Sequence, residues 1–256
     1  MSFEPKTFQY LLNVRERNGA GFLVLIDPDK YDEHTLVRFA ADAQTFGADA
    51  ILIGGSVMVS YRLDDFIRRV KSVVSIPVVI FPGSVMQVSK EADAILWLSL
   101  VSGRNPELLI GSHVVAAPAL KELGLEPIST AYMLVESGQT TAAGFISQTL
   151  PLPRHKPEIA AAHALAAEYL GMKIAYLEAG SGAERPVPEE MVYAVSQTVS
   201  IPVIVGGGIQ SPDEARRKVD AGASFVVVGN AFEHRRDTAY LRDMIEAVHI
   251  KLPRDV

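Results

Sequence analysis

The chain of 256 residues contains no cysteine. This absence excludes disulfide bonds, thiolate metal sites and thiol nucleophiles. Positive charge is also sparse, because 24 lysines and arginines stand against 30 aspartates and glutamates, a formal net charge of −6, and no basic run occurs. We therefore expect no dedicated nucleic-acid-binding surface, which needs concentrated positive charge.

Long hydrophobic runs are missing as well. The longest apolar tracts, such as Phe22–Ile26 and Phe225–Val228, are the size of strands and fall far short of the roughly 20 residues that span a bilayer. Residues Met1–Tyr10 show neither the basic start nor the apolar stretch of a secretory signal. We expect a cytoplasmic protein with at most peripheral membrane contact, since no amphipathic anchor is evident.

Short β-branched runs alternate with longer amphipathic stretches along the whole chain. Eight such runs predict strands, which leaves about 32 residues for each strand–helix unit. Their near-continuous apolar character indicates burial on both faces, as in a parallel sheet covered by helices. The expected strands are Phe22–Ile26, Ala50–Ile53, Pro77–Phe81, Ala94–Leu98, Pro127–Leu134, Lys173–Leu177, Pro202–Val205 and Ser224–Val228.

The stretches between these runs predict helices, and Gly124 and Gly171 are placed to end two of them. Two intervals differ. Pro82–Asp93 is too short for a helix with its two loops, and Val135–Pro153 has the composition of a long loop. The expected helices are His34–Phe46, Leu63–Val74, Pro106–Leu123, Pro157–Leu170, Pro188–Val199, Pro212–Ala221 and Thr238–Val248.

This order of elements predicts an α/β fold, a single (β/α)8 TIM barrel over residues 1–256. The barrel is expected to be modified, with its third helix replaced by a short irregular segment. A doubly wound open sheet is the alternative. It is less favoured because Asp27-Pro28-Asp29 follows the first strand, where that fold carries its glycine fingerprint.

Glycine-rich segments follow the last three strands, where the active sites of TIM barrels lie. They are Tyr176–Gly182, Gly206–Ile209 and Gly229–Asn230. Glycine lets backbone N–H groups approach an anion, and a short helix from Ala231 would point its positive end at the same place. Turn formation alone explains any single glycine, but three clusters at successive strand ends predict a phosphate site.

Acidic residues follow the first strand, at Asp27 and Asp29, beside Lys30. Carboxylates so spaced suit Mg²⁺, which takes one or two of them together with phosphate oxygens. A turn that caps the next helix is an equal alternative. The second strand ends in Gly54-Gly55-Ser56, and the Ser56 hydroxyl would reach the same ion because these strands are neighbours.

Tyr176 and Glu178 share one face of the sixth strand, so both are expected to point into the barrel mouth. A carboxylate beside a phosphate site would bind or deprotonate a substrate hydroxyl, or else orient the loop glycines. Other features keep two interpretations: Arg154-His155-Lys156 as a diphosphate contact or a solvated loop, and Trp97 as groove lining or core. The six histidines show no metal-binding spacing.

Together these segments resemble the geranylgeranylglyceryl phosphate synthase family, prenyltransferases related to the heptaprenylglyceryl phosphate synthases. The resemblance extends from Leu23 to about Phe232, and it implies a modified barrel that lacks a regular third helix. Its specific motifs are Leu25–Lys30, Ile53–Ser56, Phe81–Gly83, Tyr176–Gly182, Gly206–Ile209 and Gly229–Asn230.

The resemblance implies that the C3 hydroxyl of sn-glycerol 1-phosphate is joined to geranylgeranyl diphosphate, with Mg²⁺ as cofactor. It assigns catalysis to Glu178 and Tyr176, the metal to Asp27 and Ser56, and a diphosphate contact to Lys30. A heptaprenyl or other chain is an alternative substrate. The glycerol phosphate would be held by Tyr176, Leu177, Glu178, Ala179, Gly180, Ser181, Gly182, Gly207, Gly208, Gly229 and Asn230.

Two other functions would also use a glycine-rich phosphate-binding site. One is a phosphosugar isomerase or lyase, which needs neither Mg²⁺ nor a prenyl groove. The other is a sensor that binds a phosphate ligand without turnover. For any of these, an apolar barrel exterior favours a homo-oligomer, a dimer or larger.

Overall fold

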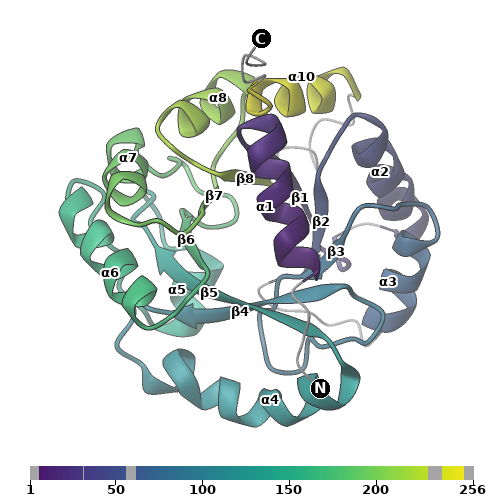
Figure 1. Cartoon of the computed structure of the whole chain (residues 1–256), viewed down its shortest axis with the longest axis horizontal. Helices are drawn as coiled ribbons and strands as arrows, with labels where there is room; N and C mark the ends of the chain where they lie inside the picture. Colours follow the sequence, from purple (N-terminus) through teal and green to yellow (C-terminus); the bar gives the residue numbers. More distant parts are fainter. Residues whose placement is uncertain (1–5, 31, 56–61, 230–237, 251–256) are drawn as a thin grey trace.

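The computed structural model describes residues 6–30, 32–55, 62–229 and 238–250. Eight parallel strands pair in chain order, and β1 closes the sheet against β8 (Figure 1). The expected TIM barrel is thereby confirmed. The strands are β1 (Gly21–Ile26), β2 (Ala50–Ile53), β3 (Val78–Ile80), β4 (Ala94–Leu100), β5 (Glu126–Leu134), β6 (Ile174–Glu178), β7 (Val203–Gly206) and β8 (Phe225–Val228).

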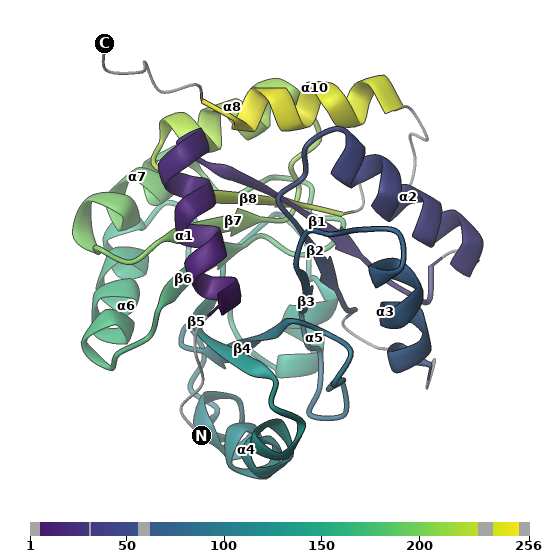
Figure 2. The ribbon, with the colours of Figure 1, turned by 45° about the vertical axis from the view of Figure 1, so that its right-hand side comes forward.

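Helices surround the barrel (Figure 2). Local signals fix several ends: Asp32 accepts a hydrogen bond from Thr35 N at 2.9 Å, and Gly124 ends a helix at φ 68°. The helices are α1 (Lys6–Asn18), α2 (Glu33–Thr45), α3 (Leu63–Lys71), the π-helical turn η1 (Glu107–Gly111), α4 (Ser112–Leu123), α5 (Ala142–Ser147), α6 (Pro157–Tyr169), α7 (Glu189–Thr198), α8 (Pro212–Asp220) and α10 (Thr238–Val248).

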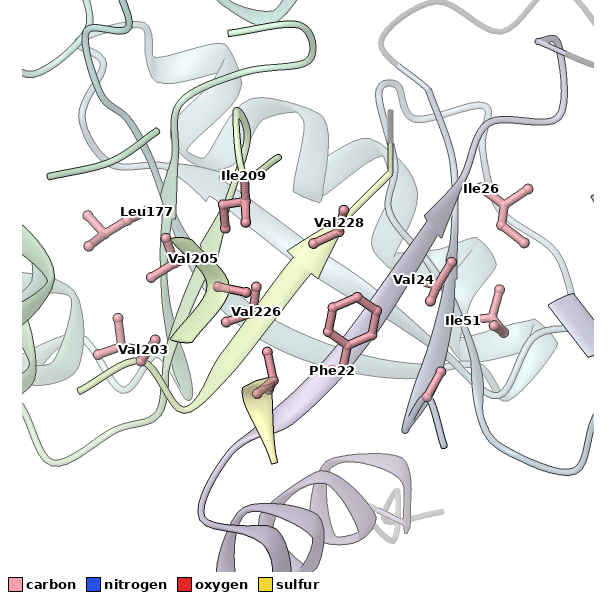
Figure 3. Close-up of a cluster of buried hydrophobic side chains, with 14 of the residues drawn as sticks. Phe22, Val24, Ile26, Ile51, Leu177, Val203, Val205, Ile209, Val226 and Val228 are labelled. Atoms are coloured by element: carbon pink, nitrogen blue, oxygen red, sulfur yellow. The ribbon is translucent and has the colours of Figure 1, made fainter. Parts of the chain in front are cut away.

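The strands bury both of their faces, as alternation of side chains requires. Phe22, Val24 and Ile26 point outward into the cluster between the sheet and the helices (Figure 3), whereas Leu23 belongs to the cluster inside the barrel. Both clusters pack along the strands, and the outer one extends to loop residues beyond the carboxyl ends, such as Ala179 and Ile209, so the residues at those ends have buried neighbours.

The third unit is irregular, as expected. Residues 81–93, all within the described part of the chain, form turns and no helix before β4 begins. The barrel therefore lacks helical cover between α3 and α4.

Three features differ from the expectation. The expected elements begin at Phe22, but α1 precedes them and lies across the amino-terminal end of the barrel (Figure 1). Its Leu11 and Val14 pack into the inner cluster, and the buried Glu126 carboxylate accepts hydrogen bonds from Thr7 N (2.7 Å) and Phe8 N (3.0 Å). These contacts join residues far apart in sequence, which explains why the local pattern did not predict them.

The interval Val135–Pro153 is the second correction, because it is not loop throughout. It contains the short helix α5, whose N-terminus is capped by Thr141 accepting from Gly144 N at 3.2 Å. The expected helix Pro106–Leu123 is also divided, into η1 and α4. Within the part of the chain that the structure describes, no helix has the length and apolar character needed to cross a membrane.

Candidate active site

A cavity of about 710 Å³ opens at the carboxyl ends of the strands. One end is polar and is lined by Asp27, Lys30, Glu178 and glycines of the loops after β6, β7 and β8. From it an apolar arm runs toward the irregular third unit. The side chains lining that arm include Phe81, Val85, Val88, Trp97, Leu98, Leu100, Leu108, Ala116 and Ile146.

Glu178 is the last residue of β6 and is buried at the polar end, with 6% of its surface exposed. Burial raises the pKa of its carboxyl group to about 7, although the hydrogen bond from Gly180 N and the nearby Tyr176 hydroxyl both favour the ionised form. Gly180 N donates to Glu178 Oε1 at 2.6 Å. The carboxylate is thus oriented, and it is balanced between its two protonation states near neutral pH.

Tyr176 lies on the same face of β6, fully buried beneath Glu178. Its ring stacks on Phe81 at 5.5 Å between centroids and meets Tyr132 edge-on at 5.4 Å. Its hydroxyl is also buried and makes no hydrogen bond of good geometry within the described residues. Burial and the neighbouring carboxylate raise its pKa, so the hydroxyl keeps its proton and can donate.

Glycine is required at the junction of the loops after β6 and β7. Gly207 has φ +82°, and a Cβ there would lie 2.4 Å from Glu178 Oε1 and 2.5 Å from Gly180 N. Gly180 has φ +101° and is crowded by Thr141 in the same way. A side chain at Gly207 would push the Glu178 carboxylate out of place, and a side chain at Gly180 would collide with Thr141.

The structure brings most of the predicted glycerol phosphate residues to one wall of the cavity. Three do not line it: Tyr176 lies below, while Leu177 and Ala179 are buried in the outer hydrophobic cluster, where Figure 3 shows Leu177. Asn230 lies outside the described residues. The predicted residues that line the cavity are Glu178, Gly180, Ser181, Gly182, Gly207, Gly208 and Gly229.

Asp27 comes directly after β1, the strand that pairs with β8. Its Oδ1 accepts a hydrogen bond from Asp29 N at 3.1 Å, and its other oxygen would lie 2.8 Å from a Cβ on Gly55. The helix cap that was the alternative role for this turn comes from Asp32 instead. Asp27 and Lys30 both line the cavity, whereas Ser56 lies outside the described residues.

The donor set around Asp27 fits Mg²⁺ rather than a metal caged wholly by protein. Among the described residues, no group of three or more histidine, aspartate or glutamate side chains could surround an ion. Mg²⁺ binds through one or two carboxylates and completes its shell with water and substrate phosphates. The missing side chain at Gly55 lets the loop after β2 approach the Asp27 carboxylate closely.

Arg154 supports the loops instead of facing a ligand. Its guanidinium donates to Glu136 O at 2.9 Å and to Pro186 O at 3.1 Å, joining the loops after β5 and β6. Lys156 lies 3.6 Å from Glu158 on the helix surface. Trp97 lines the apolar arm and packs on His113 at 4.5 Å between ring centroids, so its groove-lining role is favoured.

A family model described as the PcrB family matches residues 12–249. The chain belongs to the PcrB family. Curated relatives named geranylgeranylglyceryl phosphate synthase include those of Chitinophaga pinensis, 45% identical over 97% of this chain and 98% of the relative, and Korarchaeum cryptofilum, 47% identical over 88% and 93%. The resemblance inferred from the motifs is thereby confirmed.

A solved relative gives the same result in three dimensions. The (S)-3-O-geranylgeranylglyceryl phosphate synthase of Thermoplasma acidophilum, determined in complex with sn-glycerol-1-phosphate, superposes with a TM-score of 0.89 at 35% identity. The match covers 94% of this PcrB-family chain and 98% of that one.

Two residues of this PcrB-family chain, one lining the cavity and one bonded to the backbone of its wall, were not predicted from the sequence. Tyr132 lines the cavity from β5, and Gln87 is buried in the irregular third segment. The sequence shows only a glutamine in an irregular segment. Its burial, which requires hydrogen-bond partners for the amide, and the identity of those partners depend on the fold.

Proposed function

We propose that this PcrB-family enzyme is a geranylgeranylglyceryl phosphate synthase. It joins the C3 hydroxyl of sn-glycerol 1-phosphate to geranylgeranyl diphosphate and depends on Mg²⁺. The observation that carries the proposal is one continuous cavity, in which a glycine-lined polar end containing the buried, oriented Glu178 continues into an apolar arm. The names of the relatives support the same activity.

The phosphate of glycerol phosphate is held by backbone rather than by basic side chains. Gly180, Gly207, Gly208 and Gly229 line the polar end, where N–H groups without neighbouring side chains can approach an anion closely. This arrangement explains how a chain with a formal charge of −6 binds an anionic substrate.

Glu178 accepts the proton of the attacking hydroxyl. The oxygen of that hydroxyl forms a bond to C1 of the prenyl chain, the bond from C1 to the diphosphate breaks, and the diphosphate leaves with its electron pair. A pKa of about 7 suits this role, because a base works best when its pKa lies near the working pH. Tyr176, directly below, stabilises the ionised carboxylate with its hydroxyl.

The diphosphate would lie at the β1 side of the mouth, next to the loop after β8. Asp27, with Ser56, would hold Mg²⁺, which when bound neutralises charge on the leaving group. Lys30 would add a second positive charge at the same place. In this arrangement the diphosphate lies beside Asp27, after β1, and the glycerol phosphate lies beside the glycines after β6, β7 and β8.

The apolar arm receives the prenyl chain. It opens where the third helix is missing, and its walls are the side chains of β4, α4 and α5. Burial of hydrocarbon there stabilises the bound chain by about 0.8 kcal/mol for each CH₂ group. A longer chain, such as heptaprenyl, remains the second candidate substrate.

The direct test uses purified protein, sn-glycerol 1-phosphate and a series of prenyl diphosphates from ten to thirty-five carbons. We expect Mg²⁺-dependent release of diphosphate, with the highest kcat/KM for the twenty-carbon chain. Absence of release with every chain would overturn the proposal. Turnover of phosphosugars that survives chelation of the metal would favour an isomerase, and tight glycerol phosphate binding without turnover would favour a sensor.

A further inference from the structure

Gln87 is a buried amide in the segment that replaces the third helix. Only 5% of its surface is exposed, and both the oxygen and the nitrogen of its side-chain amide form hydrogen bonds with backbone groups. Its Oε1 accepts a hydrogen bond from Gly83 N at 2.8 Å, and its Nε2 donates to Gly55 O at 3.2 Å. This side chain therefore joins the loop after β3 to the loop after β2.

The loop after β2 lies against the residue assigned to the metal. The hydrogen bonds between β1 and β2 continue as far as Gly54, whose N–H donates to Ile26 O at 3.1 Å. Gly55 then contacts the Asp27 carboxylate so closely that a Cβ would lie 2.8 Å from Oδ2. Because Gln87 holds the carbonyl of that same glycine, its amide sets how near the β2 loop comes to Asp27.

We propose that Gln87 is a positioning residue that holds the β2 loop against Asp27 and thereby sets the affinity of this half of the site for Mg²⁺–diphosphate. The inference rests on the proposed function, which places the diphosphate here. In a regular strand–helix unit a helix after β3 would pack against the outside of the barrel. Here the segment after β3 has no helix, and the buried Gln87 side chain joins it to the loop after β2. Gln87 bonds Gly83 and Gly55, which are not among the residues proposed to hold glycerol phosphate, so the affinity for that ligand should not depend on Gln87.

Calorimetry with two ligands tests this role. The probes are inorganic diphosphate with Mg²⁺, and sn-glycerol 1-phosphate alone. Gln87→Met keeps the shape of the side chain and removes both hydrogen bonds. We expect it to weaken Mg²⁺–diphosphate binding about tenfold or more, as is usual when a group that orients metal ligands is lost, and to leave the glycerol phosphate Kd unchanged.

Gln44→Met is the matched control. Gln44 also uses its side chain to hold backbone, accepting from Ser75 N and Ile76 N, but at the amino-terminal end of the barrel. Both substitutions are expected to lower the melting temperature. Only Gln87→Met should weaken Mg²⁺–diphosphate binding.

Three outcomes overturn the inference. They are wild-type affinity for Mg²⁺–diphosphate in Gln87→Met, equal weakening of both ligands, and equal weakening by Gln44→Met. If Gln87→Met does not fold, Gln87→Asn retains an amide on a shorter side chain and should show the same selective loss, smaller in size; wild-type affinity in that variant also overturns it. Wild-type protein that binds neither ligand would instead contradict the proposed function itself.

Discussion

Beside β6, β7 and β8 the cavity wall consists largely of glycine backbone, whereas beside β3 and β4 it consists of apolar side chains. The first region belongs to regular strand–helix units, whose loops pack so tightly that a Cβ at Gly207 would collide with Glu178. The second lies where a helix is missing. The regular units therefore give a closely packed wall of backbone, while the one irregular unit leaves a space lined by apolar side chains.

Among the residues at the polar end of the cavity, substitution of Glu178 is expected to reduce activity most. Glu178→Gln keeps the shape of the side chain but cannot accept the hydroxyl proton, so kcat should fall about 10³-fold. Diphosphate release measures this loss, and circular dichroism checks the fold. Glu168→Gln is the control, because Glu168 accepts from Ser200 N at 2.8 Å on the outer surface. A Glu178→Gln enzyme with near wild-type kcat would remove this residue from the chemistry.

The glycine packing of the polar end is tested by Gly207→Ala. The added methyl group would displace the Glu178 carboxylate, and we expect kcat/KM to fall about 10²-fold, as misplacement of a catalytic group typically does. Gly171→Ala is the matched control, since Gly171 has nearly the same φ (+84° against +82°) but nothing within 4 Å of its Cβ. Equal losses of activity in both variants would show that backbone strain, not crowding of Glu178, is responsible.

The apolar arm should respond to volume instead of charge. Ala116 lines the arm from α4 and is buried, so Ala116→Phe shortens the space for the chain. We expect KM for geranylgeranyl diphosphate to rise about tenfold, since overpacking a filled site costs about 1–3 kcal/mol, with little change for the ten-carbon substrate. Val114→Phe, at an exposed position of the same helix, is the control. A uniform effect on all chain lengths would place the prenyl chain elsewhere.

The smallest effect concerns pH. Because the pKa of Glu178 is raised to about 7, kcat/KM should increase with pH through that value as the carboxylate forms. Stability should change in the opposite direction. Between the ordinary pKa of 4.5 and about 7 the folded state retains a proton that the unfolded state has lost, so the free energy of unfolding decreases as pH rises.

Urea unfolding at pH 5 and pH 8 measures the change in stability. Glu178→Gln carries no titratable group at this position, so it should lose less stability than the wild type between these two pH values. The same dependence in both proteins would mean that Glu178 does not carry the raised pKa.

Much of the fold could be predicted from local pattern. The ranges Ala50–Ile53 and Thr238–Val248 agree with β2 and α10 residue for residue, because the apolar runs and helical periodicity there are uninterrupted. The absence of the third helix was predicted from the interval Pro82–Asp93, which is too short for a helix with its two loops. Other features depend on distant partners: α1 lies on the barrel end through Glu126, and α5 interrupts an interval rich in glycine, threonine and proline.

The site shows the same division. The local pattern indicated the candidate residues, because a carboxylate, a tyrosine and three glycine clusters occupy strand ends, and strand ends meet at one face of a barrel. The burial, the ionisation and the contacts of these residues depend on the tertiary structure. It buried Glu178 and so raised its pKa to about 7, set Tyr176 beneath it, turned Arg154 to the loop carbonyls, and fixed the β2 loop through Gln87. Burial and hydrogen bonding arise from packing between units far apart in the chain, which no local pattern contains.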